Sequence, residues 1–271
     1  MNERQNYLAE GFRNVDRQTD VEKFKACLTA MESLSSFRTY KEETYQLLKP
    51  EEGGVFIDVG CGLGFDVERL AKTTSAKIIG LDTSYELLGD ARRRAQDFGI
   101  ANADYVLADA GLHCFSDGQF DGARVDRTLQ HLERPERIIE EMTRVVRKGG
   151  RVVCAEPDWG SFFIDDDDAA VVREICREWT TSIRNPFIGR ELPRLMASAG
   201  LADIRTSGRL LATYGLRDVN LIYDVRKTSG IVSEEHRSDS FNHWYQKLAS
   251  RDPQSPVFAG VTIVIAAALK A

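Results

Sequence analysis

The sequence predicts an α/β fold in which helices pack on the faces of a parallel sheet. Short β-rich apolar runs alternate with helical patterns between about Gly53 and Glu156, which is typical of parallel strands joined by helices. A composition of 42% hydrophobic and 29% charged residues is ordinary for a globular chain. A length of 271 residues allows one large domain or two small ones and excludes a small disulfide scaffold.

Five strands are expected in this region, each an apolar run that ends in polar or small residues. They are residues 55–60, 77–82, 104–109, 120–125 and 151–156. The clearest helix runs from Pro135 to Arg147, because apolar residues such as Ile138 and Met142 recur there at helical spacing. Pro135 suits the first turn of that helix.

The flanks of this unit are expected to be partly helical. Residues 1–52 predict an N-terminal helical cover, with helical character from Val21 to Leu48, and residues 53–271 predict the main domain. Two further helices (Ala169–Ile183 and Arg190–Ala199), a strand near residues 202–207 and a final strand at 258–269 are expected to follow.

Two features of the C-terminal half need a separate interpretation. Asp165 to Asp168 resemble a metal site, but acidic residues also stabilise the N-terminal end of a helix, and a helix start is predicted. Residues 208–256 lack the apolar pattern of strands and are expected to form an irregular, partly helical insertion. Because this insertion precedes the last strand, it can reach over the central strands as a lid.

Charge and cysteine usage exclude several classes of protein. A formal charge of −6 and no basic run argue against nucleic-acid binding. Five scattered cysteines without a C-x-x-C pair encode neither a disulfide framework nor a zinc site, and no metal is expected. The longest apolar run, residues 258–269, is too short to span a bilayer, and residues 1–12 do not form a secretory signal. A cytoplasmic location is therefore expected.

The most informative motif is D-V-G-C-G-L-G at residues 58–64, where the first strand turns into a helix. Glycines at alternate positions allow a sharp turn and a close approach to a ligand. In a dinucleotide site this turn would face pyrophosphate, which Asp58 and Asp66 would repel. Both carboxylates instead suit the sulfonium and ammonium groups of S-adenosylmethionine (SAM).

Two more carboxylates follow the next strands. Asp82 ends the second strand and can accept hydrogen bonds from both hydroxyls of a ribose, in SAM or in NAD. Asp109 ends the third strand and can accept from an adenine amino group, beside the backbone N–H of Ala110. Because ligands bind at the carboxyl ends of parallel strands, these acids are expected to form one nucleoside site.

With these residues the chain resembles the class I SAM-dependent methyltransferases, D-V-G-C-G-L-G matching their first motif. The segments F-D-G-A-R-V-D-R-T-L-Q-H-L and R-V-V-C-A-E-P-D are similar to the small-molecule branch, which includes ubiquinone/menaquinone-type enzymes. The resemblance implies a Rossmann-like sheet of seven strands, the last antiparallel, with helices on both faces. It also implies SAM as cofactor, bound by Asp58, Gly60, Cys61, Gly62, Gly64, Asp82, Thr83, Asp109, Ala110 and Val125.

Departures from the motifs of related enzymes reduce the range of possible methyl acceptors. The N-P-P-Y or D-P-P-Y signature of many amide and base N-methyltransferases is absent, and the corresponding segment reads R-V-D-R-T-L. No aromatic-rich sterol motif precedes Gly53, the cysteines form no arsenic-binding set, and the full acidic pattern of metal-dependent catechol O-methyltransferases is missing. A small organic methyl acceptor is expected; the oligomeric state is not predicted.

Candidate catalytic residues follow the fourth and fifth strands. His131 can serve as a general base near neutral pH or can be structural, and Asp126 and Arg127 lie close to the expected acceptor. Glu156 and Asp158 follow the fifth strand, and Asp158 is a candidate for acceptor binding.

The two flanking segments supply candidates for closing the site. Tyr7, Phe12, Arg38 and Lys41 are expected near the cofactor, where a cation can pair with the methionine carboxylate or form a solvated helix face. The lid carries five aromatic residues that can wall an apolar pocket, and Tyr223 and Trp244 are the candidates for binding the acceptor. The five are Tyr214, Tyr223, Phe241, Trp244 and Tyr245.

Three alternative functions remain open. A short-chain dehydrogenase would use Y-x-x-x-K, which Tyr223 to Lys227 fits, but Tyr45 to Lys49 fits it in an impossible place. A domain that binds SAM without turnover has the same motifs. An RNA methyltransferase is also possible, although the acidic balance and the lack of a basic appended domain argue against it.

Overall fold

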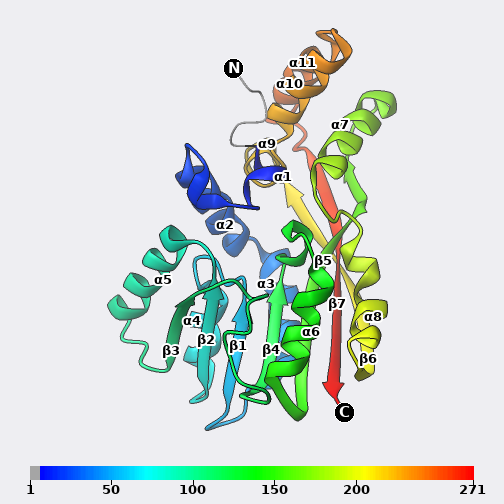
Figure 1. The fold of residues 1–271 in the computed structure, drawn as a ribbon. Helices are drawn as coiled ribbons and strands as arrows, with labels where there is room; N and C mark the ends of the chain where they lie inside the picture. The colour runs from blue at the N-terminus through cyan, green and yellow to red at the C-terminus, as the bar shows by residue number, and fades with distance from the viewer. Residues whose placement is uncertain (1–6) are drawn as a thin grey trace.

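The computed structural model describes residues 7–271, in which seven strands form one sheet in the order β3-β2-β1-β4-β5-β7-β6 (Figure 1). β7 pairs antiparallel with both of its neighbours, and the other strands run parallel to one another. This confirms the expected sheet. The strands are β1 (Val55–Val59), β2 (Lys77–Asp82), β3 (Ala103–Leu107), β4 (Phe120–Asp126), β5 (Val146–Ile164), β6 (Leu201–Tyr214) and β7 (Phe258–Lys270).

Helices cover both faces of the sheet, as expected. Alternate residues of β5 belong to two separate cores: Val153 packs with the core of one face, and Val152 and Cys154 pack with the other. The helices are α1 (Leu8–Gly11), η1 (Val15–Arg17), α2 (Val21–Ser33), α3 (Ser35–Leu48), α4 (Phe65–Thr73), α5 (Tyr85–Asp97), η2 (Leu129–His131), α6 (Pro135–Val145), α7 (Ala169–Ser182), α8 (Ile188–Ser198), α9 (Leu216–Tyr223), α10 (Val225–His236) and α11 (Ser240–Arg251).

Two strands are longer than the sequence indicates. β5 continues to Ile164, because Phe163 and Ile164 pair again with β7 after an irregularity. β6 continues to Tyr214, so the expected irregular start of the insertion at Gly208 is wrong. Residues 208–214 pair with β7 through the backbone, and such pairing does not require an alternating apolar pattern at an exposed edge. The insertion between β6 and β7 is instead α9 to α11.

The acidic run Asp165 to Asp168 is a helix start, as expected. The side chain of Asp168 accepts a hydrogen bond from the backbone N–H of Val171 at 3.1 Å and caps α7. Pro135 is likewise the first residue of α6.

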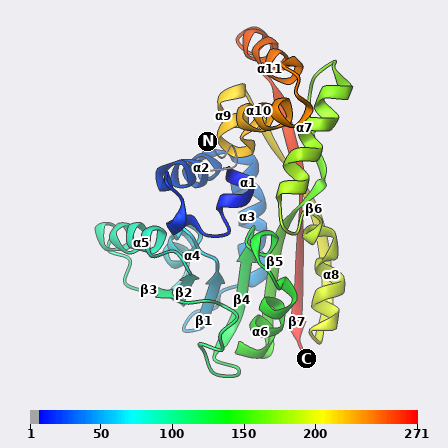
Figure 2. The same ribbon diagram turned by 45° about the horizontal axis from the view of Figure 1, so that its top comes forward.

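A cap covers the carboxyl ends of the central strands; we define it as α1, α2 and α9 to α11. Figures 1 and 2 show α1 and α2 above β1 and β4, beside α9, with α10 and α11 beyond. Lys23 of α2 forms an ion pair with Asp224 at 2.6 Å, and the hydroxyl groups of Tyr7 and Thr228 lie 3.0 Å apart. The N-terminal segment and the C-terminal insertion are therefore joined into one cover.

Within residues 7–271, none of the helices combines the length and the apolar composition that crossing a membrane requires.

Candidate active site

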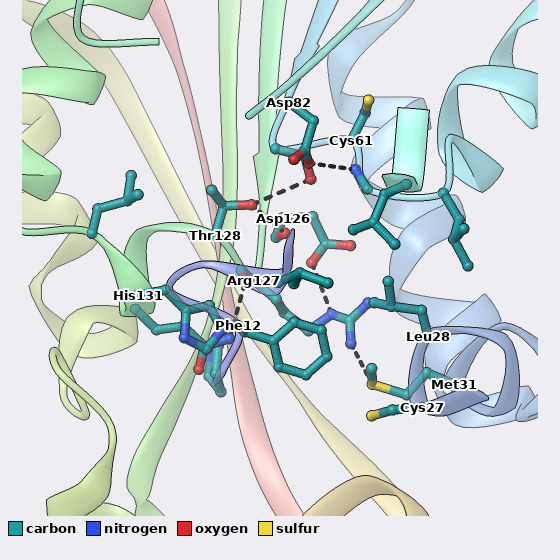
Figure 3. A pocket seen from close by; sticks show the side chains of 18 of the residues that line it. Phe12, Cys27, Leu28, Met31, Cys61, Asp82, Asp126, Arg127, Thr128 and His131 are labelled. Carbon is teal, nitrogen blue, oxygen red and sulfur yellow. Dashed lines mark hydrogen bonds and ion pairs between the residues drawn. The ribbon is translucent and has the colours of Figure 1, made fainter. Parts of the chain in front are cut away.

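A cavity of about 220 Å³ lies between the cap and the carboxyl ends of the central strands. Its lining includes the loops after β1, β2, β3 and β4, together with residues of α1, α2, α7 and α9. In Figure 3, Asp82 and Cys61 lie at one end, whereas Arg127, Phe12 and His131 lie together at the other. The cavity thus has two ends of different composition, and its position is the one where open α/β sheets bind ligands.

The glycine loop after β1 forms the first end. Gly60, Gly62 and Gly64 have φ angles of 71°, 53° and 70°, in the left-handed region that favours glycine. A Cβ on Gly60 would lie 2.2 Å from the hydroxyl of Thr128, and one on Gly64 would lie 2.6 Å from the ring of Tyr105. Gly62 has no neighbouring atom within 3.5 Å of that position and lines the cavity, so its backbone is open to a ligand.

Asp82 holds the glycine loop from the end of β2. Its Oδ2 atom accepts a hydrogen bond from Gly62 N at 2.7 Å, and its Oδ1 atom accepts one from Ser84 N at 2.9 Å. Burial raises the pKa of Asp82, and these backbone donors oppose that rise. A carboxylate has about four acceptor positions, so Asp82 retains capacity for the two hydroxyls of a ribose. The chemistry of this end therefore fits the nucleoside of SAM.

The other predicted cofactor residues divide into two groups. Cys61, Thr83, Asp109 and Ala110 line the cavity. Gly64 and Val125 are not among the lining residues, and Val125 is fully buried in the core.

Asp58 and Asp66 also line the cavity but have protein partners that the sequence did not reveal. Arg124 Nη1 lies 2.7 Å from Asp58 Oδ1 and 3.5 Å from Asp66 Oδ2, and Lys41 Nζ lies 2.9 Å from Asp66 Oδ2. Burial raises the pKa of Asp58 to about 6 against the opposing effect of Arg124. For Asp66, the two cations outweigh burial and hold the pKa well below its usual range. The protein thus neutralises much of the charge that we assigned to the cofactor.

The two candidate residues at the end of β4 differ in how well they are paired. Asp126 accepts hydrogen bonds from the Tyr40 hydroxyl at 3.0 Å and from Arg124 Nη2 at 3.0 Å. Arg127 has a φ of 50°, and its guanidinium donates to the thioether of Met31, a weak acceptor. Its buried Nε has no hydrogen-bond partner, and Asp126 Oδ1 lies 3.5 Å away.

His131 lies in the same end of the cavity as Arg127. Its ring centroid is 5.6 Å from that of Phe12, and its buried Nδ1 has no hydrogen-bond partner. Burial, followed by the positive charges of Arg13, Arg127 and Arg184, lowers the pKa of His131 to about 3. An imidazole with so low a pKa is a weak proton acceptor, which argues against the general-base role.

This low pKa predicts a loss of stability in mild acid. Below the ordinary value of 6.5 the unfolded chain protonates His131 while the folded chain does not, so the free energy of unfolding falls as pH decreases from 6.5 towards 3. The slope from this residue is at most about 1.4 kcal/mol per pH unit. Urea unfolding between pH 7 and 5 should show a smaller slope for His131→Phe, whereas the exposed control His243→Phe should match the wild type. Equal slopes for all three proteins would contradict the expectation.

One of the five expected lid aromatics, Tyr223, lines the cavity. Its hydroxyl lies 3.2 Å from Thr213 Oγ1, so the ring is held in place from β6. Trp244 lies in α11 outside the cavity lining and donates to Asp166 at 3.1 Å. Tyr214 is 64% exposed on the far end of β6, and neither Phe241 nor Tyr245 is among the lining residues. The insertion thus contributes its first helix to the site.

Three other expected residues also lie outside the cavity lining. Asp158 forms a two-pronged ion pair with Arg190, with N–O distances of 2.7 and 2.8 Å. Arg38 is exposed on α3, and the ring of Tyr7 is buried in the cap. Phe12 and Lys41 do line the cavity.

Sequence reasoning missed four residues that line the second end. Trp159 follows the parallel part of β5, Trp179 lies in α7, Gln130 lies in η2, and Arg13 follows α1. Trp159 Nε1 donates to Gln130 Oε1 at 2.7 Å, which fixes both side chains. Two tryptophans spaced 20 residues apart carry no local pattern that would place them together.

Comparison with known proteins places the chain in a methyltransferase family. Residues 50–200 match a family described as "Methyltransferase domain". An uncharacterised 37.1 kDa protein of a Streptomyces fradiae transposon is 35% identical over 89% of this chain and 70% of its own length. Demethylmenaquinone methyltransferase of Bacillus velezensis is 28% identical over 65% of this chain and 84% of its own length. Phosphoethanolamine N-methyltransferase 2 of Haemonchus contortus, solved in complex with S-adenosyl-L-methionine, is 16% identical with a TM-score of 0.62 and covers 96% of this chain and 60% of its own.

Proposed function

For this chain, which belongs to the class I SAM-dependent methyltransferases of small-molecule type, we propose methyl transfer to an oxygen, nitrogen or activated carbon of a small organic metabolite. The observation that carries the proposal is one continuous cavity whose two ends differ in composition. The end with Asp82 and the glycine loop suits a nucleoside, and the end with Trp159, Trp179 and Tyr223 suits an apolar acceptor.

The chain's residues contribute mainly by binding and alignment. SAM supplies a methyl group on a sulfonium, which is already activated for displacement. Asp82 and the backbone of Gly62 hold the nucleoside end, so that the acceptor in the aromatic end can approach the methyl carbon in line with sulfur. The cap lies over the cavity and shields a bound acceptor in part from water. Asp126 and Arg127, which line the cavity at the end of β4, are positioned to contact the acceptor.

A transfer assay with isotopically labelled SAM tests the proposal. Labelled methyl groups should appear in low-mass compounds when the protein is incubated with a metabolite extract. Parallel incubation with RNA tests the alternative acceptor, and label found in RNA alone would refute the proposal. We expect that NADH does not displace SAM. Displacement would support the dehydrogenase alternative, which requires NADH to bind in this cavity.

Asp82→Ala should weaken the binding of SAM and S-adenosylhomocysteine. Loss of a charge-assisted acceptor, together with release of Gly62 N, is expected to reduce the binding free energy by about 1.5–3 kcal/mol. Asp104→Ala is the matched control, because Asp104 is an exposed carboxylate on β3 and is not among the cavity-lining residues. Titration calorimetry that gives equal affinities for both variants would remove Asp82 from the cofactor site.

A further inference from the structure

Positive charge gathers at the aromatic end of the cavity. Arg13 and Arg127 both line it, and Arg127 Nε forms a long ion pair of 3.5 Å with Asp126 Oδ1. Arg13 Nη2 donates to the backbone oxygen of Ser182 at 3.0 Å, and Arg127 donates to Met31. A guanidinium in a cavity with such partners keeps most of its capacity to bind an anion.

Two carboxylates, Asp126 and Asp66, act on Arg127, and each has another cation as a partner. Asp126 lies 3.5 Å from Arg127 Nε, but it is shared with Arg124 at 3.0 Å and with Tyr40. Glu10 acts on Arg13 from the same N-terminal segment, while Arg184 adds a repulsive charge from the loop after α7. The low pKa of His131, to which Arg13, Arg127 and Arg184 contribute, is consistent with a positive field at this end.

Polar atoms in the same wall lack partners. Trp179 Nε1, His131 Nδ1 and Arg127 Nε are buried without a hydrogen bond within the protein. Trp179 is 3% exposed, and an indole N–H can only donate. The residues that carry these atoms line the cavity, and leaving such groups unpaired costs free energy that a bound ligand with acceptor atoms would offset.

An aromatic wall completes this end. The rings of Trp159 and Trp179 have centroids 5.5 Å apart, and the Tyr223 ring lies 6.2 Å from Trp159 and 6.3 Å from Trp179. Phe12 covers the ring of His131. Fixed aromatic faces of this kind select an apolar, planar body.

We propose that this end binds the methyl acceptor as an oxyanion, an ionised hydroxyl or carboxyl group carried on an apolar, largely aromatic body. The proposal rests on the proposed methyl transfer and narrows its substrate class. Arg127 and Arg13 bind the anionic oxygen, with Trp179 as a further donor. A protonated amine is disfavoured, because it would bring a third positive charge beside two guanidinium groups.

The same arrangement removes the need for a protein base. The acceptor hydroxyl releases its proton to bulk water, because the guanidinium groups stabilise the resulting oxyanion. A lone pair of that oxygen forms the new bond to the methyl carbon, while the methyl–sulfur bond breaks and its electron pair remains on sulfur. The anionic acceptor and the cationic sulfonium thereby become a neutral methyl ether or ester and a neutral thioether.

The probe for this proposal is 4-nitrophenol, whose anion absorbs visible light and so reports its own ionisation. Bound to protein saturated with S-adenosylhomocysteine, it should ionise with an apparent pKa at least about one unit lower than in buffer, a tenfold change in its ionisation equilibrium. Arg127→Met and Arg13→Met should each weaken phenolate binding about tenfold or more and reduce the shift. Arg127→Lys should retain part of both effects, and the exposed control Arg226→Met should retain all of them.

Three results would overturn the proposal. The first is that neutral 4-nitroanisole binds as tightly as the phenolate, and the second is that neither 4-nitrophenol nor 4-nitrobenzoate binds. The third is that Arg127→Met weakens S-adenosylhomocysteine as much as the phenolate, which would assign the guanidinium to the cofactor's carboxylate. Failure of the wild type to bind S-adenosylhomocysteine at all would instead refute the proposed function, so the two failures are distinguishable.

Discussion

Arg124→Met is expected to lower the free energy of unfolding by about 3–5 kcal/mol, because it leaves buried carboxylates without their shared cation. Arg124 is 1% exposed in β4, and its guanidinium lies within 3.5 Å of Asp58, Asp66 and Asp126. Methionine fills similar space but cannot offset those charges. Urea unfolding followed by circular dichroism measures the loss.

A second substitution separates charge from packing. Asp58→Asn in the Arg124→Met background removes one uncompensated charge and should recover part of the stability, since burial raises the pKa of Asp58 and makes its ionised form costly. Lys77→Met is the control: Lys77 pairs with Asp104 at 2.7 Å, but both side chains are more than half exposed, so the change should stay within about 0.5 kcal/mol. Equal losses for Arg124→Met and Lys77→Met would show that the buried cluster does not stabilise the fold.

The sheet was predictable because its signals are local. Each strand from β1 to β4 is a short apolar run that ends in a polar residue or a turn, and the glycine loop marks the first crossover. The lengths of β5 and β6 were not predictable in this way. Residues 208–214 are fixed by backbone pairing with β7, some 50 positions away, and their side chains at an exposed edge carry little pattern.

The candidate site was predictable at its nucleoside end and less so elsewhere. Asp82, Asp109 and the glycines lie at strand ends, and the topology brings such ends together. Arg124 was not expected as the ion-pair partner of Asp58, although a lone arginine inside the largely apolar run F-D-G-A-R-V indicates a buried ion pair. Trp159 and Trp179 meet only through the packing of α7 against β5, which no local sequence pattern encodes.

Glu156→Ala is expected to lower the free energy of unfolding and also to disturb the aromatic end of the cavity. The fully buried carboxylate accepts hydrogen bonds from the backbone N–H groups of Thr128 at 2.8 Å, Leu129 at 2.7 Å and Gln130 at 3.4 Å. Alanine leaves these donors unpaired at about 1–3 kcal/mol each. We expect a loss of about 3–5 kcal/mol. Because these donors lie in the loop that carries Arg127 and His131, methyl transfer should fall as well.

Glu156→Gln is the matched control for this loop. Its amide oxygen can replace Oε1, which accepts both short bonds, so the variant should lose about 1 kcal/mol or less at neutral pH. Burial raises the pKa of Glu156 to about 8, so the folded chain holds a proton that the unfolded chain has lost above pH 4.5. The contribution of Glu156 to the free energy of unfolding of the wild type therefore decreases as pH rises from 4.5 to 8. Glu156→Gln should remove that decrease. If Glu156→Gln were as unstable as Glu156→Ala, the ionised carboxylate itself would be essential, and the raised pKa could not describe the folded protein.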